Sequence, residues 1–187
     1  MCCLLTGAQM ISEPLLHKMK ILVIDDDRMT VTLLEQLLQR SGYCCVLGVT
    51  ESRNVLDTCV NFDPDLILLD LIMPEVDGFA ILEALRSNAP ETFLPIVVLT
   101  ADITEEAKAR ALEAGATDFL VKPVSQTEAL LRIRNLLETR RLHLVLENQR
   151  AALEDAVRER TTELRGTIAE LQAVNQHLQT STAFSGT

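Results

Sequence analysis

Short runs of apolar residues alternate along the chain with segments in which apolar residues recur every three or four positions. Such a run is typical of a buried strand, and the longer spacing is typical of an amphipathic helix. The runs predict five strands, at residues 20–25, 44–49, 65–70, 95–100 and 117–121. The periodic segments predict helices at residues 29–40, 52–62, 79–87 and 104–115, and another from Ser125 onward.

This order of elements predicts the fold class. Strands that are apolar on both faces are typical of a parallel sheet covered by helices on each side. We therefore expect an α/β fold with a five-stranded parallel sheet of the flavodoxin-like (βα)5 type, whose last helix is extended as a coiled coil. Ligands of such sheets bind at the carboxyl ends of the strands.

Polar residues stand where the predicted strands end. Asp25 and Asp26 follow the first strand, and Asp70, Thr100 and Lys122 stand at or just after the ends of the third, fourth and fifth. Carboxylates that converge in one crevice are costly unless a cation compensates their charge. Mg²⁺ prefers carboxylates together with waters and phosphate oxygens, and a lysine ammonium suits a phosphate. The pattern predicts a Mg²⁺ site with Asp70 as a nucleophile toward phosphorus, left open to solvent by the turn that follows it.

Four segments, ILVIDDD, DLILLDLIMPEVDGFAIL, PIVVLTA and DFLVKP, occur in this order between residue 20 and about residue 138. Together they resemble the receiver domain of two-component response regulators. The resemblance implies that Asp70 accepts a phosphoryl group from a histidine kinase or a phosphotransfer protein. It also implies that Asp26 and Asp70 bind Mg²⁺ directly, with Asp25 acting through water and the backbone carbonyl of Ile72 as a further ligand.

The same resemblance assigns roles around the phosphoryl group. Thr100 and Lys122 contact it, and Phe119 takes the position of the aromatic switch that turns inward when Thr100 moves toward the phosphate. The bond between Lys122 and Pro123 matches one that is usually cis in this family. Taken singly, these residues have plainer interpretations, because an Asp after a strand is often a cap and a lone Phe is often part of the core.

Two other functions stay open. The chain could be a constitutive coiled-coil adaptor that uses the receiver fold as a binding scaffold. It could also be a phosphatase with an aspartate nucleophile, but phosphatases that resemble haloacid dehalogenases carry a second Asp two residues after the nucleophile. That position is Ile72 here, so we expect no enzymatic turnover.

From Ser125 roughly fifty residues are compatible with a helix, too many for a simple closing helix. A spacing of three and four residues, as in a coiled coil, runs through Thr161, Leu164, Ile168, Leu171, Asn175 and Leu178. Leu142, Leu146, Gln149 and Leu153 fit a similar spacing, but the register slips before Thr161. We expect a parallel homodimer through residues 139–180; the alternative is a single helix folded back on its domain.

The predicted organisation has four parts: a flexible extension at 1–19, a receiver domain at 20–138, a coiled-coil signalling helix at 139–180 and a frayed tail at 181–187. The helix resembles linkers that precede HD-GYP phosphodiesterase, diguanylate cyclase or kinase modules. No motif of those modules occurs in this sequence. We therefore expect the output module to be absent from it, unless a partner docks on the coiled coil.

Charge and cysteine content narrow the class of partner. The chain of 187 residues has a formal charge of -10, which repels a phosphate backbone, so we expect no direct binding of nucleic acid. Its five cysteines lie in no metal-ligand spacing and form a poor disulfide framework, which favours reduced thiols in the cytoplasm. No stretch reaches the roughly 18 apolar residues that span a bilayer, so we expect no membrane insertion.

Overall fold

The computed structural model describes residues 15–51, 54–74, 77–88, 93–101 and 104–184. Within these ranges, the side chains of Asn88, Glu105 and residues 174–184 are not described, so the predicted coiled-coil positions Asn175 and Leu178 lie outside the described side chains. The chain divides into two compact units, Met1–His143 and Leu144–Thr187.

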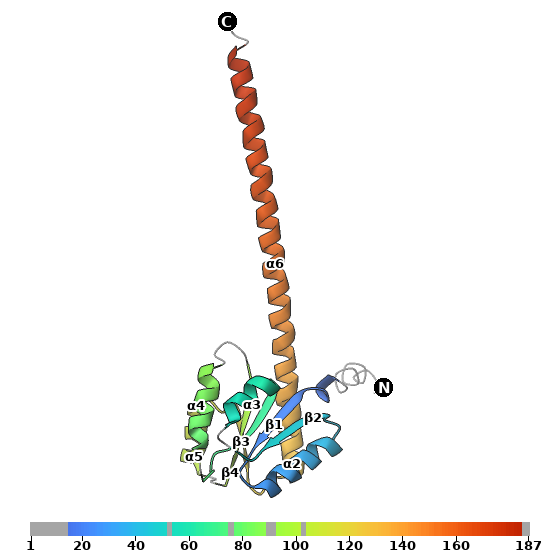
Figure 1. The fold of residues 1–187 in the computed structure, drawn as a ribbon, viewed down its shortest axis with the longest axis vertical. Coiled ribbons are helices and arrows are strands. Elements are labelled where there is room, and N and C mark those ends of the chain that lie inside the picture. The colour runs from blue at the N-terminus through green and yellow to red at the C-terminus, as the bar shows by residue number, and fades with distance from the viewer. Residues whose placement is uncertain (1–14, 52–53, 75–76, 89–92, 102–103, 185–187) are drawn as a thin grey trace, which may run out of the picture. The chain divides into compact units, whose positions relative to one another are not determined.

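The first unit contains a parallel sheet of five strands in the order β2-β1-β3-β4-β5 (Figure 1). The strands are β1 (Lys20–Ile24), β2 (Cys45–Val49), β3 (Leu66–Asp70), β4 (Ile96–Thr100) and β5 (Asp118–Val121). Every residue of β3 and β4 is buried, whereas the edge strand β2 is half-buried throughout. The predicted flavodoxin-like α/β fold is confirmed, and each strand end lies within one residue of its expected position.

Within the described residues, the helices that connect and cover the strands are α2 (Arg28–Arg40), α3 (Val55–Phe62), α4 (Gly78–Asn88), α5 (Glu105–Glu113) and α6 (Gln126–Phe184). Local residues fix several of their ends. The side chain of Asp27 accepts backbone hydrogen bonds at the start of α2, and that of Thr104 does so at the start of α5. Gly42 and Gly115, with φ of 97° and 101°, follow the ends of these two helices.

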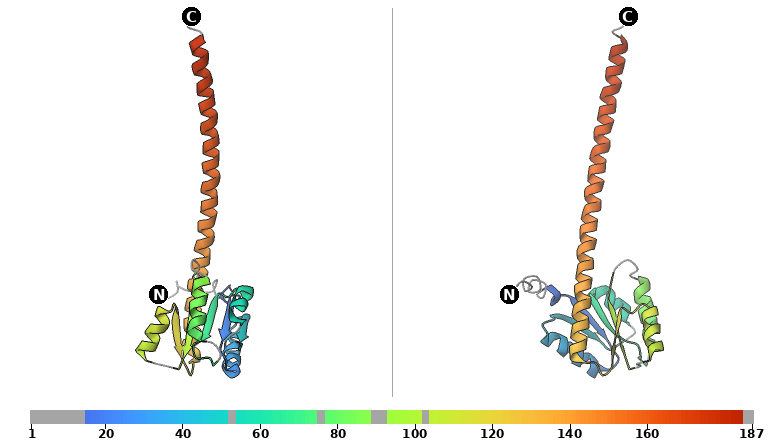
Figure 2. Two further views of the ribbon diagram at one scale, coloured as in Figure 1. Left: turned by 60° about the vertical axis from the view of Figure 1, so that its left-hand side comes forward. Right: turned by 180° about the vertical axis from the view of Figure 1, so that it is seen from behind.

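The core has two layers, one on each face of the sheet. Helices α3, α4 and α5 cover one face, where Leu22 and Leu69 of the sheet pack in one cluster with Leu82 of α4 (Figure 2). Helix α2 and the first turns of α6 cover the other, and Ile133 and Leu137 of α6 are fully buried there.

A polar cluster at the opposite, amino end of the strands holds α6. Arg140, only 7% exposed, donates a hydrogen bond from Nη1 to the carbonyl of Phe93 at 2.9 Å, and its Nε lies 3.7 Å from Asp65 Oδ1. The other oxygen of Asp65 accepts from the backbone N–H of Lys20 at 2.9 Å. The ring of His143 stacks on Phe93 with centroids 4.5 Å apart. We call Lys20, Asp65, Phe93, Arg140 and His143 the amino-edge cluster.

Residues just before β1 also belong to the domain. Leu16 is 2% exposed and Met19 is 8% exposed. The carbonyl of His17 accepts from the N–H of Cys44 at 2.8 Å, and its ring meets that of Tyr43 edge-on. These side chains pack with the domain that follows, and the predicted boundary at residue 20 stays a prediction. The other predicted boundaries stay predictions.

In the second unit α6 continues as one helix to Phe184, and the predicted long helix is confirmed. Every residue from Val145 to Ala173 is exposed. The pairing of this helix as a coiled coil stays a prediction. Among the described helices, none combines the length and apolar content needed to cross a bilayer. The cysteines within the described ranges, Cys44, Cys45 and Cys59, are free thiols.

Candidate functional site

Three carboxylates gather at the carboxyl ends of β1 and β3, which are neighbours in the sheet. Asp25, Asp26 and Asp70 each offer one carboxylate oxygen, and these oxygens lie within 4.8 Å of one another. Asp25 is fully buried and Asp70 is 4% exposed, whereas Asp26 faces solvent. The structure thus brings together the three acidic residues that the sequence pattern singled out.

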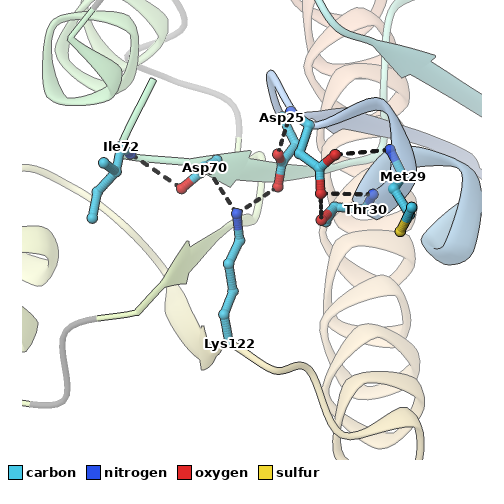
Figure 3. A network of polar contacts seen from close by, with 7 residues as sticks. Asp25, Met29, Thr30, Asp70, Ile72 and Lys122 are labelled. Atoms are coloured by element: carbon cyan, nitrogen blue, oxygen red, sulfur yellow. Dashed lines mark hydrogen bonds and ion pairs between the residues drawn. The ribbon is translucent and has the colours of Figure 1, made fainter. Parts of the chain in front are cut away.

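Lys122 reaches between two of these carboxylates from the loop after β5 (Figure 3). Its Nζ lies 2.7 Å from Asp25 Oδ2 and 2.7 Å from Asp70 Oδ2. Burial lowers the pKa of Lys122, but its hydrogen bonds and ion pairs with the two carboxylates outweigh burial and raise that pKa overall. Burial raises the pKa of Asp25, and the hydrogen bond from Lys122 offsets this only in part. The ammonium is therefore a permanent positive charge in the site.

Backbone N–H groups fix the orientation of the two buried carboxylates. The N–H of Asp27 donates to Asp25 Oδ1 at 2.9 Å, and the N–H of Ile72 donates to Asp70 Oδ1 at 3.1 Å. The side chain of Asp27 turns away and accepts from the Thr30 hydroxyl and from the backbone N–H groups of Met29 and Thr30. The Thr30 hydroxyl is the main cause of the lowered pKa of Asp27. Three consecutive aspartates thus differ in environment and role.

The loop after Asp70 depends on a glycine. A Cβ on Gly78, the first residue of α4, would lie 2.5 Å from Leu71 Cα and 2.6 Å from the carbonyl oxygen of Asp70. Only glycine allows the start of α4 to approach the backbone of Asp70 this closely. The expectation that the turn leaves the Asp70 carboxylate open to solvent is wrong, because Asp70 is almost completely buried beneath the Lys122 ammonium.

The remaining predicted residues surround this group. Thr100 ends β4 and is 7% exposed, and its carbonyl accepts from the N–H of Lys122 at 2.8 Å. Phe119 in β5 is partly buried, with Lys108 Nζ 5.3 Å and the Arg132 guanidinium 5.8 Å from its ring centroid. The peptide bond between Lys122 and Pro123 is cis, as the resemblance implied. The switch roles of Thr100 and Phe119 stay predictions.

A groove of about 280 Å³ lies beside Lys122, between α2 and the start of α6. It is mainly apolar and is lined by Thr30, Leu33, Leu34, Leu37, Lys122, Pro123, Val124 and Gln126. On α2, Leu33 is 60% exposed and Met29 is 70% exposed. Sequence reasoning missed this groove, although Leu33, which lines it, falls on the polar side of the predicted helix and could have indicated it.

The donor set suits Mg²⁺. The carboxylates of Asp25, Asp26 and Asp70 supply hard oxygen ligands, the type that Mg²⁺ prefers. Three carboxylates and the single Lys122 ammonium leave a formal charge of -2, which a divalent cation would balance. The backbone carbonyl of Ile72 stays a predicted ligand, and the Ile72 side chain is 64% exposed at the rim of the site.

Comparison with known proteins gives the same assignment. The family described as "Response regulator receiver domain" matches residues 21–134. The alkaline phosphatase synthesis transcriptional regulatory protein PhoP of Bacillus subtilis is 39% identical over 118 residues, 63% of this chain and 48% of the relative. The transcriptional regulatory protein HprR of Escherichia coli is 40% identical over 116 residues, 62% of this chain and 50% of the relative. The chain spans about half the length of the curated relatives it matches.

Solved structures agree with the fold. The receiver domain of the Francisella response regulator 1452 superposes with a TM-score of 0.60 at 27% identity, over 65% of this chain and 98% of that one. The Vibrio cholerae chemotaxis protein CheY4 superposes with a TM-score of 0.59 at 29% identity, over 64% of this chain and 98% of that one.

Proposed function

Because the chain belongs to the response regulator receiver domain family, we propose that it accepts a phosphoryl group on Asp70 at a Mg²⁺ site formed by Asp25, Asp26 and Asp70. The observation that supports this most strongly is the position of Lys122, whose ammonium is 2.7 Å from both Asp25 and Asp70. A carboxylate nucleophile beside a fixed ammonium and a cation site is the arrangement that phosphoryl transfer needs.

The proposed reaction uses this chain's own residues for attack and for charge balance. A carboxylate oxygen of Asp70 forms a bond to phosphorus while the bond from phosphorus to the donor's imidazole nitrogen breaks. The N–H of Ile72 holds the carboxylate, and Lys122 moves its contact from the carboxylate to the phosphoryl oxygens. Bound Mg²⁺ would neutralise charge on the phosphoryl oxygens. The Thr100 hydroxyl would donate to one of them.

The phosphoryl donor would be a histidine kinase or a phosphotransfer protein. The groove beside Lys122 supports such a partner, because its leucines and Pro123 offer an apolar contact within reach of the site. We expect the chemistry to be limited to phosphorylation and dephosphorylation of Asp70, with no turnover of small phosphate esters. These steps would take place in the cytoplasm, where such donors act.

The second part of the proposal is the route of the output. Phosphorylation would draw Thr100 and Phe119 inward and change the pairing of a parallel homodimer formed through residues 139–180. The signal would then reach an output module outside this sequence. The support is a helix that runs unbroken from Gln126 to Phe184 with apolar side chains exposed along it.

The test of the phosphoryl chemistry is intact mass after incubation with acetyl phosphate and Mg²⁺. We expect one phosphoryl adduct that disappears in Asp70→Asn and in wild-type protein treated with EDTA. A matched control is Asp77→Asn, which changes an exposed aspartate of the same loop and should leave the adduct intact. An adduct that survives Asp70→Asn would refute the assignment of the phosphoacceptor.

The competing hypothesis is a constitutive adaptor. If the receiver fold were only a scaffold, Asp70→Asn would leave partner binding unchanged in pull-down from cells that express the cognate kinase. The charge imbalance of the site argues against this hypothesis, because a scaffold has no need for three converging carboxylates.

A further inference from the structure

The exposed apolar side chains of α6 form one straight stripe in the second unit. The members of this stripe are Leu146, Leu153, Val157, Leu164, Ile168 and Leu171, each 53–68% exposed. At about 100° per residue they fall within a band roughly 60° wide around the helix axis. Arg150 falls in the same band, and its Nε pairs with Glu154 at 2.8 Å. Between residues 144 and 173, whose exposure is described, Val145 is the one further large apolar residue that is exposed, and it lies outside this band. A helix of which every residue from 145 to 173 is exposed needs a partner for such a stripe.

The spacing of the stripe is eleven residues, not seven. Leu146, Val157 and Ile168 are successive members of one column, and Leu153 and Leu164 form a second. A third column runs through Gln149, Arg160 and Leu171. With this period, the slip that a seven-residue repeat requires between Leu153 and Thr161 disappears. Arg160 forms an ion pair with Glu163 at 2.8 Å, so its charge can stay at the rim while its stem packs.

We infer that this stripe pairs with the same stripe of a second copy, in parallel and in register, through an eleven-residue repeat. The inference rests on the homodimer in the proposed function and specifies its geometry. An eleven-residue repeat corresponds to about 3.67 residues per turn, which gives a right-handed supercoil where a seven-residue repeat gives a left-handed one. The contact surface runs from Leu146 to Leu171, and Arg150 and Arg160, each paired with a glutamate of its own helix, interrupt its apolar character.

Charges beside the stripe favour the parallel arrangement. Arg158 and Arg165 lie on one flank of the helix, about 110° from the stripe, and Glu163 and Glu170 lie on the other. In a parallel pair the opposite flanks of the two copies face each other, so arginine meets glutamate. Farther toward the N-terminus the arginine flank carries Glu147 and Glu154. With the same offset along the helix, Glu147 would face Ala152 of the partner and Glu154 would face Glu159, so the favourable pairing of charges is confined to residues 158–170.

The test is disulfide formation between two copies of the full chain that carry one added cysteine. Leu153→Cys and Leu146→Cys should form a disulfide-linked dimer severalfold more efficiently than Glu154→Cys and Glu147→Cys. The reason is that an uninterrupted seven-residue repeat extended back from Leu164 would place 154 and 147 in the contact, whereas an eleven-residue repeat places 153 and 146 there. A seven-residue repeat that slips before Thr161 also places 153 and 146 in the contact but uses 161, so Arg160→Cys should crosslink more efficiently than Thr161→Cys only with the eleven-residue repeat. All variants share the five native cysteines, and peptide mass spectrometry identifies the added bridge. Val157→Cys should crosslink as well as Leu153→Cys, and Asp155→Cys on the opposite face should not.

Sedimentation of the unmodified chain separates two kinds of failure. A monomer at all concentrations overturns the dimer and this inference together, while phosphorylation of Asp70 is tested independently by mass. A dimer that crosslinks at 154 and 147 overturns only the eleven-residue repeat. A dimer with no crosslink at any of these positions overturns the parallel register.

Discussion

A carboxylate at each end of strand β3 lies close to a cation, but the two ends differ in the balance of their charges. At the amino end, Asp65 lies close to Arg140 and also accepts a hydrogen bond from the backbone N–H of Lys20. One carboxylate there neutralises the charge of one guanidinium. At the carboxyl end Asp70 shares Lys122 with Asp25, and Asp26 adds a third carboxylate. The Asp65–Arg140 pair is balanced, and the carboxyl end keeps an excess of negative charge.

The difference separates a structural ion pair from the proposed phosphoryl-accepting site. The amino-edge cluster uses its charges to hold α6 against the sheet, with His143 stacked on Phe93 at the same edge. The carboxyl end keeps more carboxylates than Lys122 can balance, and such an electrostatic cost is typical of functional sites. Substitutions at the two ends should therefore change stability in opposite directions.

The largest effect is expected at the amino end. Arg140→Met should lower the free energy of unfolding by about 3 kcal/mol, because it leaves Asp65 and the Phe93 carbonyl without their partner. Denaturant unfolding followed by circular dichroism measures the change. The control is Arg158→Met, because the side chain of Arg158 is 81% exposed. This substitution should change the free energy of unfolding by less than about 0.5 kcal/mol. Equal effects of the two substitutions would break the comparison.

Mg²⁺ should stabilise the carboxyl end alone. At a free concentration of about 100 times its Kd, it should add about 2.7 kcal/mol to the free energy of unfolding. Asp26→Asn should remove most of this gain. Asp26 is the exposed carboxylate of the acidic group, and Lys122 pairs with the other two, so Asp26 is the carboxylate that is left for the cation. Asp57→Asn, an exposed aspartate in α3, should retain it. Thermal unfolding with and without Mg²⁺ measures all three proteins.

A pair of matched substitutions tests the opposite signs directly. Without Mg²⁺, Asp70→Asn should raise the free energy of unfolding by about 1 kcal/mol, because it removes one of three converging negative charges. Asp65→Asn should lower it by about 1 kcal/mol, because Arg140 loses its ionic partner. If both substitutions destabilise the domain, the carboxyl end stores no electrostatic cost.

The smallest effect is expected at Cys59, whose thiol is partly buried and whose pKa is shifted by burial alone. Burial raises the pKa of Cys59 to about 11, above its ordinary value of 9.0. The folded state therefore favours the neutral thiol, and this contribution to stability is present below pH 9 and is lost as the pH rises from 9 to 11. Alkylation of Cys59 should keep accelerating through this range, and Cys44, which is exposed, should react first at neutral pH. Peptide mass spectrometry of alkylated protein follows both.

The sheet and the acidic site were predictable from the sequence because both depend on local signals. Aliphatic runs such as those of β3 and β4 are long enough to identify a buried strand, and parallel strands bring their carboxyl ends to one edge. This rule alone placed Asp25, Asp70 and Lys122 together. The burial of Asp70 was not predictable, because it depends on the path of the Lys122 side chain from a loop 52 residues away.

The amino-edge cluster shows where prediction from one sequence stops. Ile133, Leu137 and Arg140 follow a helical spacing that places the arginine on the buried face of α6, which is a signal for a hidden partner. The sequence did not identify Asp65 and Phe93 as the partners of Arg140, because they precede two different strands that are distant from α6 along the chain. The eleven-residue spacing of α6 was present in the sequence, but exposure along the helix was needed to distinguish its stripe from a core-facing side.

The run Asp25-Asp26-Asp27 makes one deletion variant unusually informative. Removing any one of the three residues produces the same shortened protein, so the experiment does not choose which residue is lost. In that protein two aspartates must serve as the buried partner of Lys122, the proposed exposed metal ligand and the cap of α2. Either helix initiation or metal binding has to fail, and circular dichroism together with Mg²⁺ titration would reveal which demand the folded chain satisfies first.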